Sequence, residues 1–492
     1  MDKKLFYKST EIKYIILYAA ALVLFLLCAF HSNVWFDESY TVRLLDKSLP
    51  EICAITAKDV HPPLYYIILK FFTFIFGGSI IAMRLFSVIG SMLFAMLGYT
   101  HIRKLFDDRI GLLFSFFAAF LPQLGKYSNE IRMYSWAALF VALSAIYAYK
   151  ITKEDRRANW LLFVLFSIFS AYTHYYALLA VAVINLLLFV YILRTKAIKI
   201  SKWWLAAVSE VVLYIPWIVF FISQMLTVME GYWISLNYLT ILFETFGNIF
   251  QGSLPNLAVC ALACIVLAFC LYIAFKERKD IKYCNELRLS VVIYLAVLMI
   301  GLAVSLKRPI FTPRYMITAA GMFVFALAVI TAGSKSKHVI YGICSVVLVF
   351  SLVNCGIRIN ECYSAGNDAF KEVVEERPAG DNIFIHTEVQ SMGVMSVELP
   401  QCKHYFVNKD HWSVSAYEAY KVNVDFVEDM SFLNRYKDFD GNIWFVEYKD
   451  RESYYDEYMR NNKNCSYIEE AISCRIPYSG NQFYLSLVKI SG

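Results

Sequence analysis

The stretch YIILYAAALVLFLLCAF (residues 14–30) is a membrane-length apolar segment, and the polar string WFDESY (35–40) follows it closely. Asp37 and Glu38 are therefore paired carboxylates at the point where the chain is expected to emerge into water. No small-residue cleavage site follows the apolar run, so we interpret it as a signal anchor and not as a cleaved signal peptide.

The composition predicts a polytopic α-helical membrane protein. The 492 residues are 59% hydrophobic and only 17% charged, and 17% are aromatic, whereas a soluble chain of this length carries more charge. Apolar runs near spanning length predict about eleven transmembrane helices, at residues 14–30, 80–99, 110–124, 133–149, 160–173, 175–193, 203–222, 255–275, 289–306, 315–332 and 339–353.

The run PPLYYIILKFFTFIFG (62–77) decides the topology because it is short and contains Lys70. If it does not span, twenty-two Lys and Arg residues fall on the side of the N-terminus and nine on the other side. This asymmetry fits the positive-inside rule. We therefore expect 62–77 to be a helix in the outer interface, started by Pro62 and Pro63. The N-terminus is expected to be cytoplasmic, and the C-terminal part extracytoplasmic.

Two domains are expected. Residues 1–355 form a transmembrane domain, which includes a first outer loop with interfacial helices (31–79) and an outer connection (223–254) that is either a flap over a cavity or a plain surface loop. Residues 356–492 have the composition of a small α/β extracytoplasmic domain. Strands are predicted in 381–388, 404–408, 441–448 and 481–490, and a helix in 452–462. Four cysteines in this domain permit disulfides in three pairings: Cys362, Cys402, Cys465 and Cys474.

Three polar strings near predicted outer membrane ends carry the candidate chemistry. WFDESY is followed in the same loop by HPPLYY (61–66), which places His61 at headgroup level. YSNEIRMYSW (127–136) supplies Glu130, Arg132 and Tyr134, either as interfacial anchors or as the rim of a cavity.

The third string, KRPIFTPRYM (307–316), carries Arg308, Arg314 and Tyr315 between two helix-breaking prolines. Broken backbone must face protein or water, and arginine binds phosphate in bidentate fashion. The string is thus either a phosphate grip or a structural anchor. His174 at an outer hairpin is a packed histidine or a substrate contact, and Glu210 inside a span is interpreted as a helix–helix hydrogen-bonding residue.

These strings resemble those of the GT-C superfamily of integral-membrane glycosyltransferases, in the bacterial branch related to protein O-mannosyltransferases and to the lipid A aminoarabinose transferase. The carboxylate pair that opens the first outer loop, HPPLYY, IIAMRLFSVIG (80–90) and EIRMY (130–134) carry the resemblance. It implies a sugar donor linked to polyprenyl phosphate, with Asp37 as catalytic base. Where the aminoarabinose branch has a Glu-Lys pair before the proline, this chain has Val60-His61.

The resemblance and the strings together give a set of candidate site residues. Donor and phosphate binding is assigned to Glu38, His61, Arg132, Arg308 and Arg314. Glu130, Tyr134, His174 and Tyr315 are expected to line the substrate cavity. No cofactor is expected to be required, and a divalent metal is not favoured, although His61, His174, Asp37 and Glu38 include ligand types that bind one.

The expected function is transfer of a sugar, with inversion, to an acceptor hydroxyl at the outer face of the plasma membrane. The acceptor is a lipid, a glycan or a protein, and no nucleic acid is expected as a partner. The alternatives are a lipid-linked glycan transporter or flippase, a ligand-binding sensor, and a polysaccharide ligase or polymerase that uses a diphosphate-linked donor. The short connections on the positively charged side leave no room for a nucleotide-sugar domain.

Overall fold

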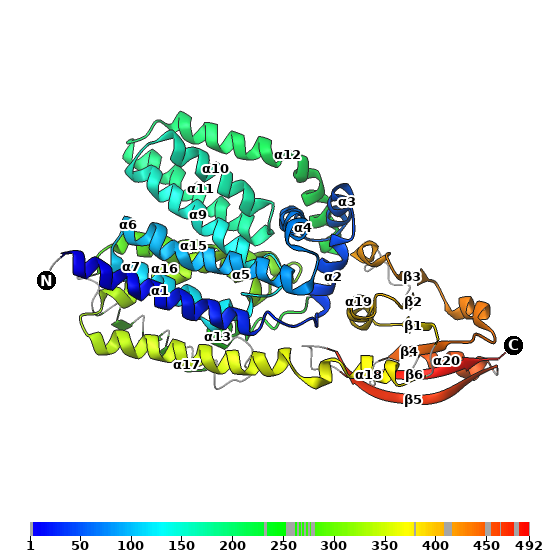
Figure 1. Ribbon diagram of the computed structural model, residues 1–492. Coiled ribbons are helices and arrows are strands. Elements are labelled where there is room, and N and C mark those ends of the chain that lie inside the picture. Colours follow the sequence, from blue (N-terminus) through cyan, green and yellow to red (C-terminus); the bar gives the residue numbers. More distant parts are fainter. Residues whose placement is uncertain are drawn as a thin grey trace. The chain divides into compact units, whose positions relative to one another are not determined.

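A computed structural model describes the chain at residues 3–230, 234–251, 261–262, 265–266, 268–269, 272–273, 276, 281–377, 380–407, 416–447, 454–462, 464–476 and 482–491. The chain divides into two compact units (Figure 1). The helical unit comprises Met1–Phe30, Val60–Gly77 and Ala82–Arg358, and the mixed unit comprises His31–Asp59, Gly78–Ile81 and Ile359–Gly492.

The helical unit consists of long apolar helices and their short connections. Its elements are α1 (Lys3–Leu27), α4 (Leu64–Phe76), α5 (Ile80–Leu97), η1 (Gly98–Ile102), α6 (Arg103–Leu105), α7 (Asp108–Phe120), α8 (Pro122–Lys126), α9 (Tyr134–Lys153), α10 (Arg157–Ala171), α11 (Tyr175–Thr195), α12 (Ile200–Glu230), α13 (Ile241–Gln251), α15 (Cys284–Ser305), η2 (Pro313–Ala319), α16 (Ala320–Gly333) and α17 (Lys337–Cys362).

The prediction of a polytopic helical membrane protein is confirmed. Within the described residues, eight helices are long and apolar enough to cross a membrane. They correspond to eight of the eleven predicted runs. The runs at 110–124 and 160–173 form the shorter helices α7 and α10, and the run at 255–275 lies largely outside the described residues.

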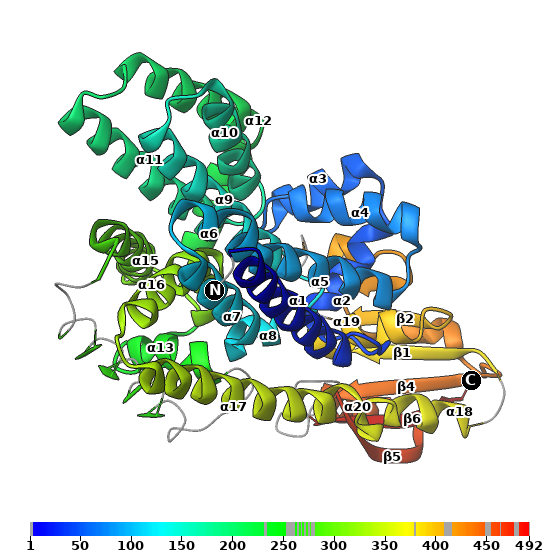
Figure 2. The ribbon, with the colours of Figure 1, turned by 60° about the vertical axis from the view of Figure 1, so that its left-hand side comes forward.

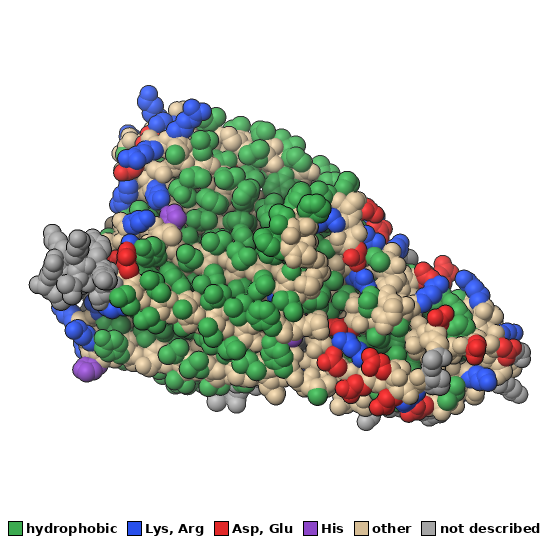
Figure 3. All heavy atoms as spheres, in the orientation of Figure 1, with side chains coloured by type: hydrophobic (Ala, Val, Ile, Leu, Met, Phe, Trp, Pro, Cys, Tyr) green, Lys and Arg blue, Asp and Glu red, His purple; other side chains and the backbone are tan. Residues whose placement is uncertain are grey.

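The surface of the helical unit agrees with this assignment. Figure 3 shows a broad hydrophobic surface over these helices, with Lys and Arg side chains gathered at one end of it. The charge separation is that expected of helices whose flanks lie in water and whose sides contact lipid. Helix α4 is 13 residues long, which is too short to span. It buries Tyr65, Tyr66 and Leu69 and exposes Phe74 and Ile75. Its interfacial position stays a prediction.

The connection at 223–254 is more helical than a surface loop. Helix α12 continues eight residues beyond the predicted end of its span, to Glu230, and α13 occupies Ile241–Gln251. The apolar pattern of ISQMLTVME (222–230) extends the helix, and the helix can continue because no proline or glycine interrupts these nine residues. Whether the segment acts as a flap stays a prediction.

The mixed unit contains a six-stranded sheet of order β3-β2-β1-β4-β6-β5 (Figure 2). Strands β3, β2, β1 and β4 are parallel to one another, whereas β6 runs antiparallel to β4 and β5 antiparallel to β6. The strands are β1 (Asn382–His386), β2 (Lys403–Val407), β3 (Val424–Val427), β4 (Asn442–Glu447), β5 (Cys465–Arg475) and β6 (Gln482–Ile490).

Helices and short turns surround this sheet: α2 (Phe36–Leu45), α3 (Leu49–Lys58), η3 (Ala365–Asn367), α18 (Ala369–Glu375), α19 (Val389–Glu398), η4 (Ala416–Tyr420), η5 (Met430–Tyr436) and α20 (Tyr454–Asn461). One face of the sheet packs with residues of α18 and α19, and the opposite face with residues of η5 and α20. Side chains alternate between the faces along β1, where Phe384 belongs to the first core and Ile383 and Ile385 to the second.

The prediction of a small C-terminal α/β domain is confirmed. All four predicted strands and the helix at 452–462 have counterparts, whereas β3, β5 and α19 were not predicted. Residues His31–Asp59 belong to this unit by their contacts, although the sequence analysis grouped them with the transmembrane domain. Cys362, Cys402, Cys465 and Cys474 are thiols and not half-cystines.

Candidate functional site

The first group of candidate residues lies in the helical unit, where α4 begins. The Leu64 N–H donates to Tyr172 O at 3.0 Å, so the HPPLYY string is held against the turn that precedes His174. His61 lies just before α4 and receives a hydrogen bond from Arg132, with 3.2 Å between Arg132 Nη2 and His61 Nε2. An arginine can only donate. His61 therefore presents an unprotonated Nε2 to it.

His174 is the centre of this group. It caps α11, and its Nδ1 accepts the Tyr176 N–H at 3.0 Å. The His174 ring lies 6.3 Å from the His61 ring, 5.9 Å from Tyr134 and 5.0 Å from Tyr315, measured between centroids. It is 4% exposed. Residues from α9, from the start of α11 and from η2 are thus brought together around one imidazole.

Positive charge dominates this group. Burial holds the pKa of His174 well below its ordinary value, and the neighbouring His61, Arg132 and Arg314 lower it further. Arg314 follows the helix-starting Pro313, and its guanidinium carbon lies 6.0 Å from the centre of the Tyr315 ring. The two guanidinium groups, and not the burial, are what favours a bound anion here. We call His61, Arg132, Tyr134, His174, Arg314 and Tyr315 the cation–aromatic cluster.

Two other candidates of the helical unit lie outside this cluster. Glu130 is buried, and its carbonyl accepts the Arg132 N–H at 2.7 Å. Arg308 is half-buried, and among the described residues no contact joins its side chain to the cluster. Glu210 accepts a hydrogen bond from Asn185 Nδ2 at 2.9 Å, which agrees with its interpretation as a helix–helix contact.

The loop that carries Glu130 and Arg132 is fixed by a network centred on Asn129. The Asn129 side chain donates to Phe25 O at 3.1 Å and accepts from Arg358 Nη2 at 3.1 Å, and Arg84 Nη1 donates to Asn129 O at 3.3 Å. Arg84 and Asn129 occur in motifs quoted above. No pattern in the sequence pointed to Arg358, which is 229 residues from Asn129.

The carboxylate pair belongs to the mixed unit. Asp37 and Glu38 lie in the first turn of α2, where the helix dipole and unpaired N–H groups stabilise negative charge. Glu38 is 1% exposed and accepts the Trp35 N–H at 3.4 Å, whereas Asp37 is half-buried. Of the two, Glu38 is therefore bound into the helix start, and Asp37 is the more accessible carboxylate.

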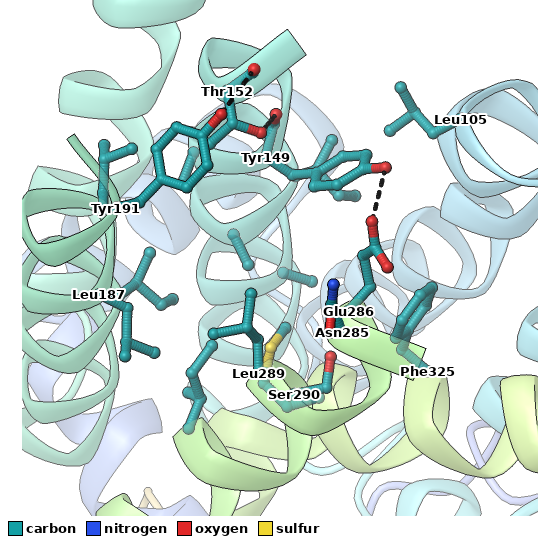
Figure 4. A pocket seen from close by; sticks show the side chains of 18 of the residues that line it. Leu105, Tyr149, Thr152, Leu187, Tyr191, Asn285, Glu286, Leu289, Ser290 and Phe325 are labelled. Atoms are coloured by element: carbon teal, nitrogen blue, oxygen red, sulfur yellow. Dashed lines mark hydrogen bonds between the residues drawn. The ribbon is translucent and has the colours of Figure 1, made fainter. Parts of the chain in front are cut away.

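A cavity of about 510 Å³ lies in the helical unit at the other ends of the same helices (Figure 4). Helices α9 and α11 begin at the cation–aromatic cluster and end at this cavity. Their last residues line it, together with the start of α15 and residues of α16. The lining is mainly Ala, Ile, Leu and Phe. At one side, Tyr149 Oη donates to Glu286 Oε1 at 3.2 Å, and Tyr191 Oη donates to Thr152 O at 3.3 Å.

Metal binding was considered for His61, His174, Asp37 and Glu38. Across the described ranges, no three His, Cys, Asp or Glu side chains come together as a ligand group. Metal dependence stays a prediction.

Comparison with known proteins agrees with this architecture. Residues 60–220 match the profile of the family described as dolichyl-phosphate-mannose-protein mannosyltransferase. The chain is also similar to the crystal structure of ArnT from Cupriavidus metallidurans in the apo state, with TM-score 0.64 and 10% identity over 98% of this chain and 99% of that chain. The same protein bound to undecaprenyl phosphate gives TM-score 0.64 and 12% identity, over 97% and 99% of the two chains. No curated protein sequence matches.

The family match covers residues 60–220, and the solved structures share the fold; both agree with the resemblance to the GT-C superfamily of integral-membrane glycosyltransferases. The resemblance found in the sequence is confirmed at this level. The profile match starts at Val60, so it includes HPPLYY, IIAMRLFSVIG and EIRMY but not WFDESY. At 10% and 12% identity the solved structures establish the fold, and they leave the substrates to be argued from this chain's own residues.

Proposed function

We propose that this protein transfers a sugar from a polyprenyl-phosphate donor to an acceptor hydroxyl at the outer face of the membrane. The observation that carries the proposal is the cation–aromatic cluster, in which Arg132 and Arg314 lie around a neutral, buried His174. Two arginines with an apolar surround suit a phosphate monoester or diester, because guanidinium groups bind phosphate oxygens in pairs. The aromatic rings of Tyr134 and Tyr315 offer faces for a sugar.

The chemistry assigns complementary roles to the two polar centres. Asp37 accepts the proton of the acceptor hydroxyl while its oxygen attacks the anomeric carbon. The bond from that carbon to the phosphate oxygen breaks, and polyprenyl phosphate leaves as an anion. Negative charge grows on the phosphate during this step, and Arg132 and Arg314 stabilise it. A single displacement inverts the anomeric configuration. Glu38 is the acid that holds the α2 start.

The donor's hydrocarbon tail requires an apolar place, and the cavity between α9, α11, α15 and α16 supports this assignment. Its wall is mainly apolar, although Lys153, Arg194 and Glu286 also line it, and two of its helices, α9 and α11, begin at the cation–aromatic cluster. A phosphate bound by that cluster would allow the prenyl chain to follow these helices. The undecaprenyl phosphate bound to ArnT from Cupriavidus metallidurans is a ligand of this type.

The same proposal fixes the orientation. Since the twenty-two Lys and Arg residues on the N-terminal side favour a cytoplasmic location, the cluster and the mixed unit are assigned to the outside. The protein is thus proposed to act at the outer face of the plasma membrane.

The test is an assay of purified protein with a panel of polyprenyl-phosphate sugars. The parent is expected to release polyprenyl phosphate in a sugar-dependent way, and Asp37→Asn to lose about 1,000-fold in kcat, the usual size of a general-base effect. Full activity in Asp37→Asn would refute the role of this residue. If both proteins are inert while lipid-linked sugar crosses proteoliposomes, the transporter alternative is correct.

A further inference from the structure

Helix α2, which carries Asp37, is a buried element of the mixed unit. Seven of its ten residues are buried, including Ser39, Tyr40 and Arg43. Its partner within the unit is α19, a helix that lies between β1 and β2 in the sequence and packs on the sheet. The position of the carboxylate is therefore set by a helix that is more than 350 residues away along the chain.

The contact between the two helices is closest at Gly393, in the middle of α19. A Cβ atom placed on Gly393 would lie 2.8 Å from Ser39 Oγ, 2.9 Å from Phe36 Cδ2 and 3.0 Å from Tyr420 Oη. Real Cβ atoms essentially never come this close, so a larger residue at position 393 requires these side chains of α2 and η4 to shift. Phe36 and Ser39 flank Asp37 and Glu38. Glycine inside a helix is unfavourable compared with alanine, which means that local helix propensity does not explain its presence.

Along α2, polar contacts lie on both sides of the residues that touch Gly393. At the N-terminal side, Val34 N–H donates to Glu398 Oε1 at 2.9 Å, and Glu398 pairs with Lys371 at 2.6 Å. At the C-terminal side, Arg43 donates to Ser396 O and pairs with Asp46 at 3.0 Å.

The middle of α2 is held as well. Ser39 Oγ donates to Phe36 O at 2.7 Å and therefore accepts from Tyr420 Oη at 3.0 Å. Three separate contacts along α19 and η4 thus fix both the distance and the register of α2.

We propose that Gly393 is a positioning residue, and that α19 of the C-terminal domain sets the place of Asp37 through the close contact that glycine permits. The inference rests on the proposed function only for its effect on catalysis. The C-terminal domain thereby gains a role in the reaction. It holds the carboxylate that accepts the proton, and a shift of one ångström in such a group costs about 100-fold in rate.

The experiment compares Gly393→Ala with Gly342→Ala in the full-length protein. Gly342 lies in α17 with open space around its Cα, so it controls for the change from glycine to alanine in a helix. Amide hydrogen exchange of residues 36–45 is measured first, because it needs no substrate. Gly393→Ala is expected to raise exchange in this segment at least 10-fold and to leave α9 and α11 unchanged. Unchanged exchange in α2 would overturn the inference, whatever the enzyme's activity.

Catalysis and phosphate binding are then measured separately. Gly393→Ala is expected to lower kcat by about 10- to 100-fold while the Kd for undecaprenyl phosphate stays within twofold of the parent value. A purely structural defect would weaken both.

If Gly393→Ala does not fold, Tyr420→Phe alone replaces it. This variant loses the hydroxyl that donates to Ser39 without adding volume, and it should raise exchange in residues 36–45 by a smaller factor. Exchange equal to the parent in this variant would also overturn the inference. A fully active Asp37→Asn protein would instead refute the proposed function and leave the exchange result valid.

Discussion

The two polar centres of this protein are built in opposite ways. In the helical unit, guanidinium groups and imidazoles gather among tyrosine rings, and burial together with the nearby positive charge keeps the pKa of His174 low. In the mixed unit, two carboxylates lie at the start of α2, where Glu38 accepts the Trp35 N–H and the preceding Val34 N–H donates to Glu398 of α19. The first arrangement favours an anion, whereas the second favours a group that accepts a proton. Sugar transfer from a phosphate needs both.

The largest expected effects distinguish the residues that bind the lipid phosphate from the residue that accepts the proton. Arg314→Ala and Arg132→Ala should each raise the Kd for undecaprenyl phosphate by about 10- to 100-fold, because each removes a charge-assisted hydrogen bond worth roughly 1.5–3 kcal/mol. Asp37→Asn should leave this Kd unchanged while it lowers kcat. Binding is measured by equilibrium dialysis with labelled lipid in detergent.

Arg308→Ala is the matched control for these arginine variants. Arg308 is a half-buried arginine of the same unit, and the described contacts do not join its side chain to the cluster. It should bind lipid within about threefold of the parent. If Arg308→Ala weakens binding as much as Arg314→Ala does, the boundary drawn around the cation–aromatic cluster is wrong.

A smaller effect on lipid binding is expected from a substitution in the cavity at the C-terminal ends of α9 and α11. Ala145→Trp introduces a large side chain into the cavity between α9, α11 and α15, since Ala145 is one of its lining residues. It should weaken binding of undecaprenyl phosphate about tenfold, equivalent to 1.4 kcal/mol, and leave binding of geranyl phosphate unchanged because the short chain does not reach the cavity. Leu161→Trp, on an exposed apolar surface, is the control. If Ala145→Trp weakens the binding of both lipids equally, the prenyl tail does not lie in this cavity.

Much of the fold could be predicted from the sequence because membrane spans have a strong signal. Eight of the eleven runs form long helices, and composition marked the start of the C-terminal domain. Strands β1, β2, β4 and β6 were predicted because each is a run of apolar and aromatic residues bounded by turn residues. Strand β5 is irregular, with shifts of register near Glu469, and α19 has a mixed pattern with Gly393 at its centre. Neither has a clear period.

The candidate site could be predicted only in part. His61, Arg132, His174 and Arg314 were chosen as separate strings, and the structure brings these four together through contacts between segments up to 140 residues apart. Sequence gives residue types but not these distances. The packing of α2 on α19 had no signal at all, because it depends on the absence of a side chain at Gly393 and on a backbone carbonyl at Ser396.

The smallest expected effect concerns a second pair of imidazoles, both buried, in the mixed unit. His386 Nε2 and His404 Nδ1 lie 3.1 Å apart, and His404 Nε2 donates to Leu399 O at 3.2 Å. His404 Nδ1 is then an acceptor, so His386 must donate to it. Both rings are neutral in this arrangement. Burial is the main cause that lowers the pKa of His404 to about 4, and the charge of Arg43 adds to it. Burial and the neighbouring His404 also lower the pKa of His386.

The sign of the pH dependence follows from these pKa values. Below about pH 6.5 the histidines of the unfolded chain bind protons, whereas those of the folded unit do not. The free energy of unfolding of the mixed unit therefore has its full value above that pH and falls as the solution becomes more acidic. At pH 5.5 the free energy of unfolding is expected to be about 1.4 kcal/mol lower because of His404.

This loss is measured by urea unfolding at pH 7.5 and at pH 5.5. Pulsed labelling of the buried thiols Cys402 and Cys474 monitors the unfolding of the mixed unit. His386→Asn/His404→Asn should be less stable at pH 7.5 but should lose this acid dependence. A double variant with the parent's acid dependence would assign the effect to other groups.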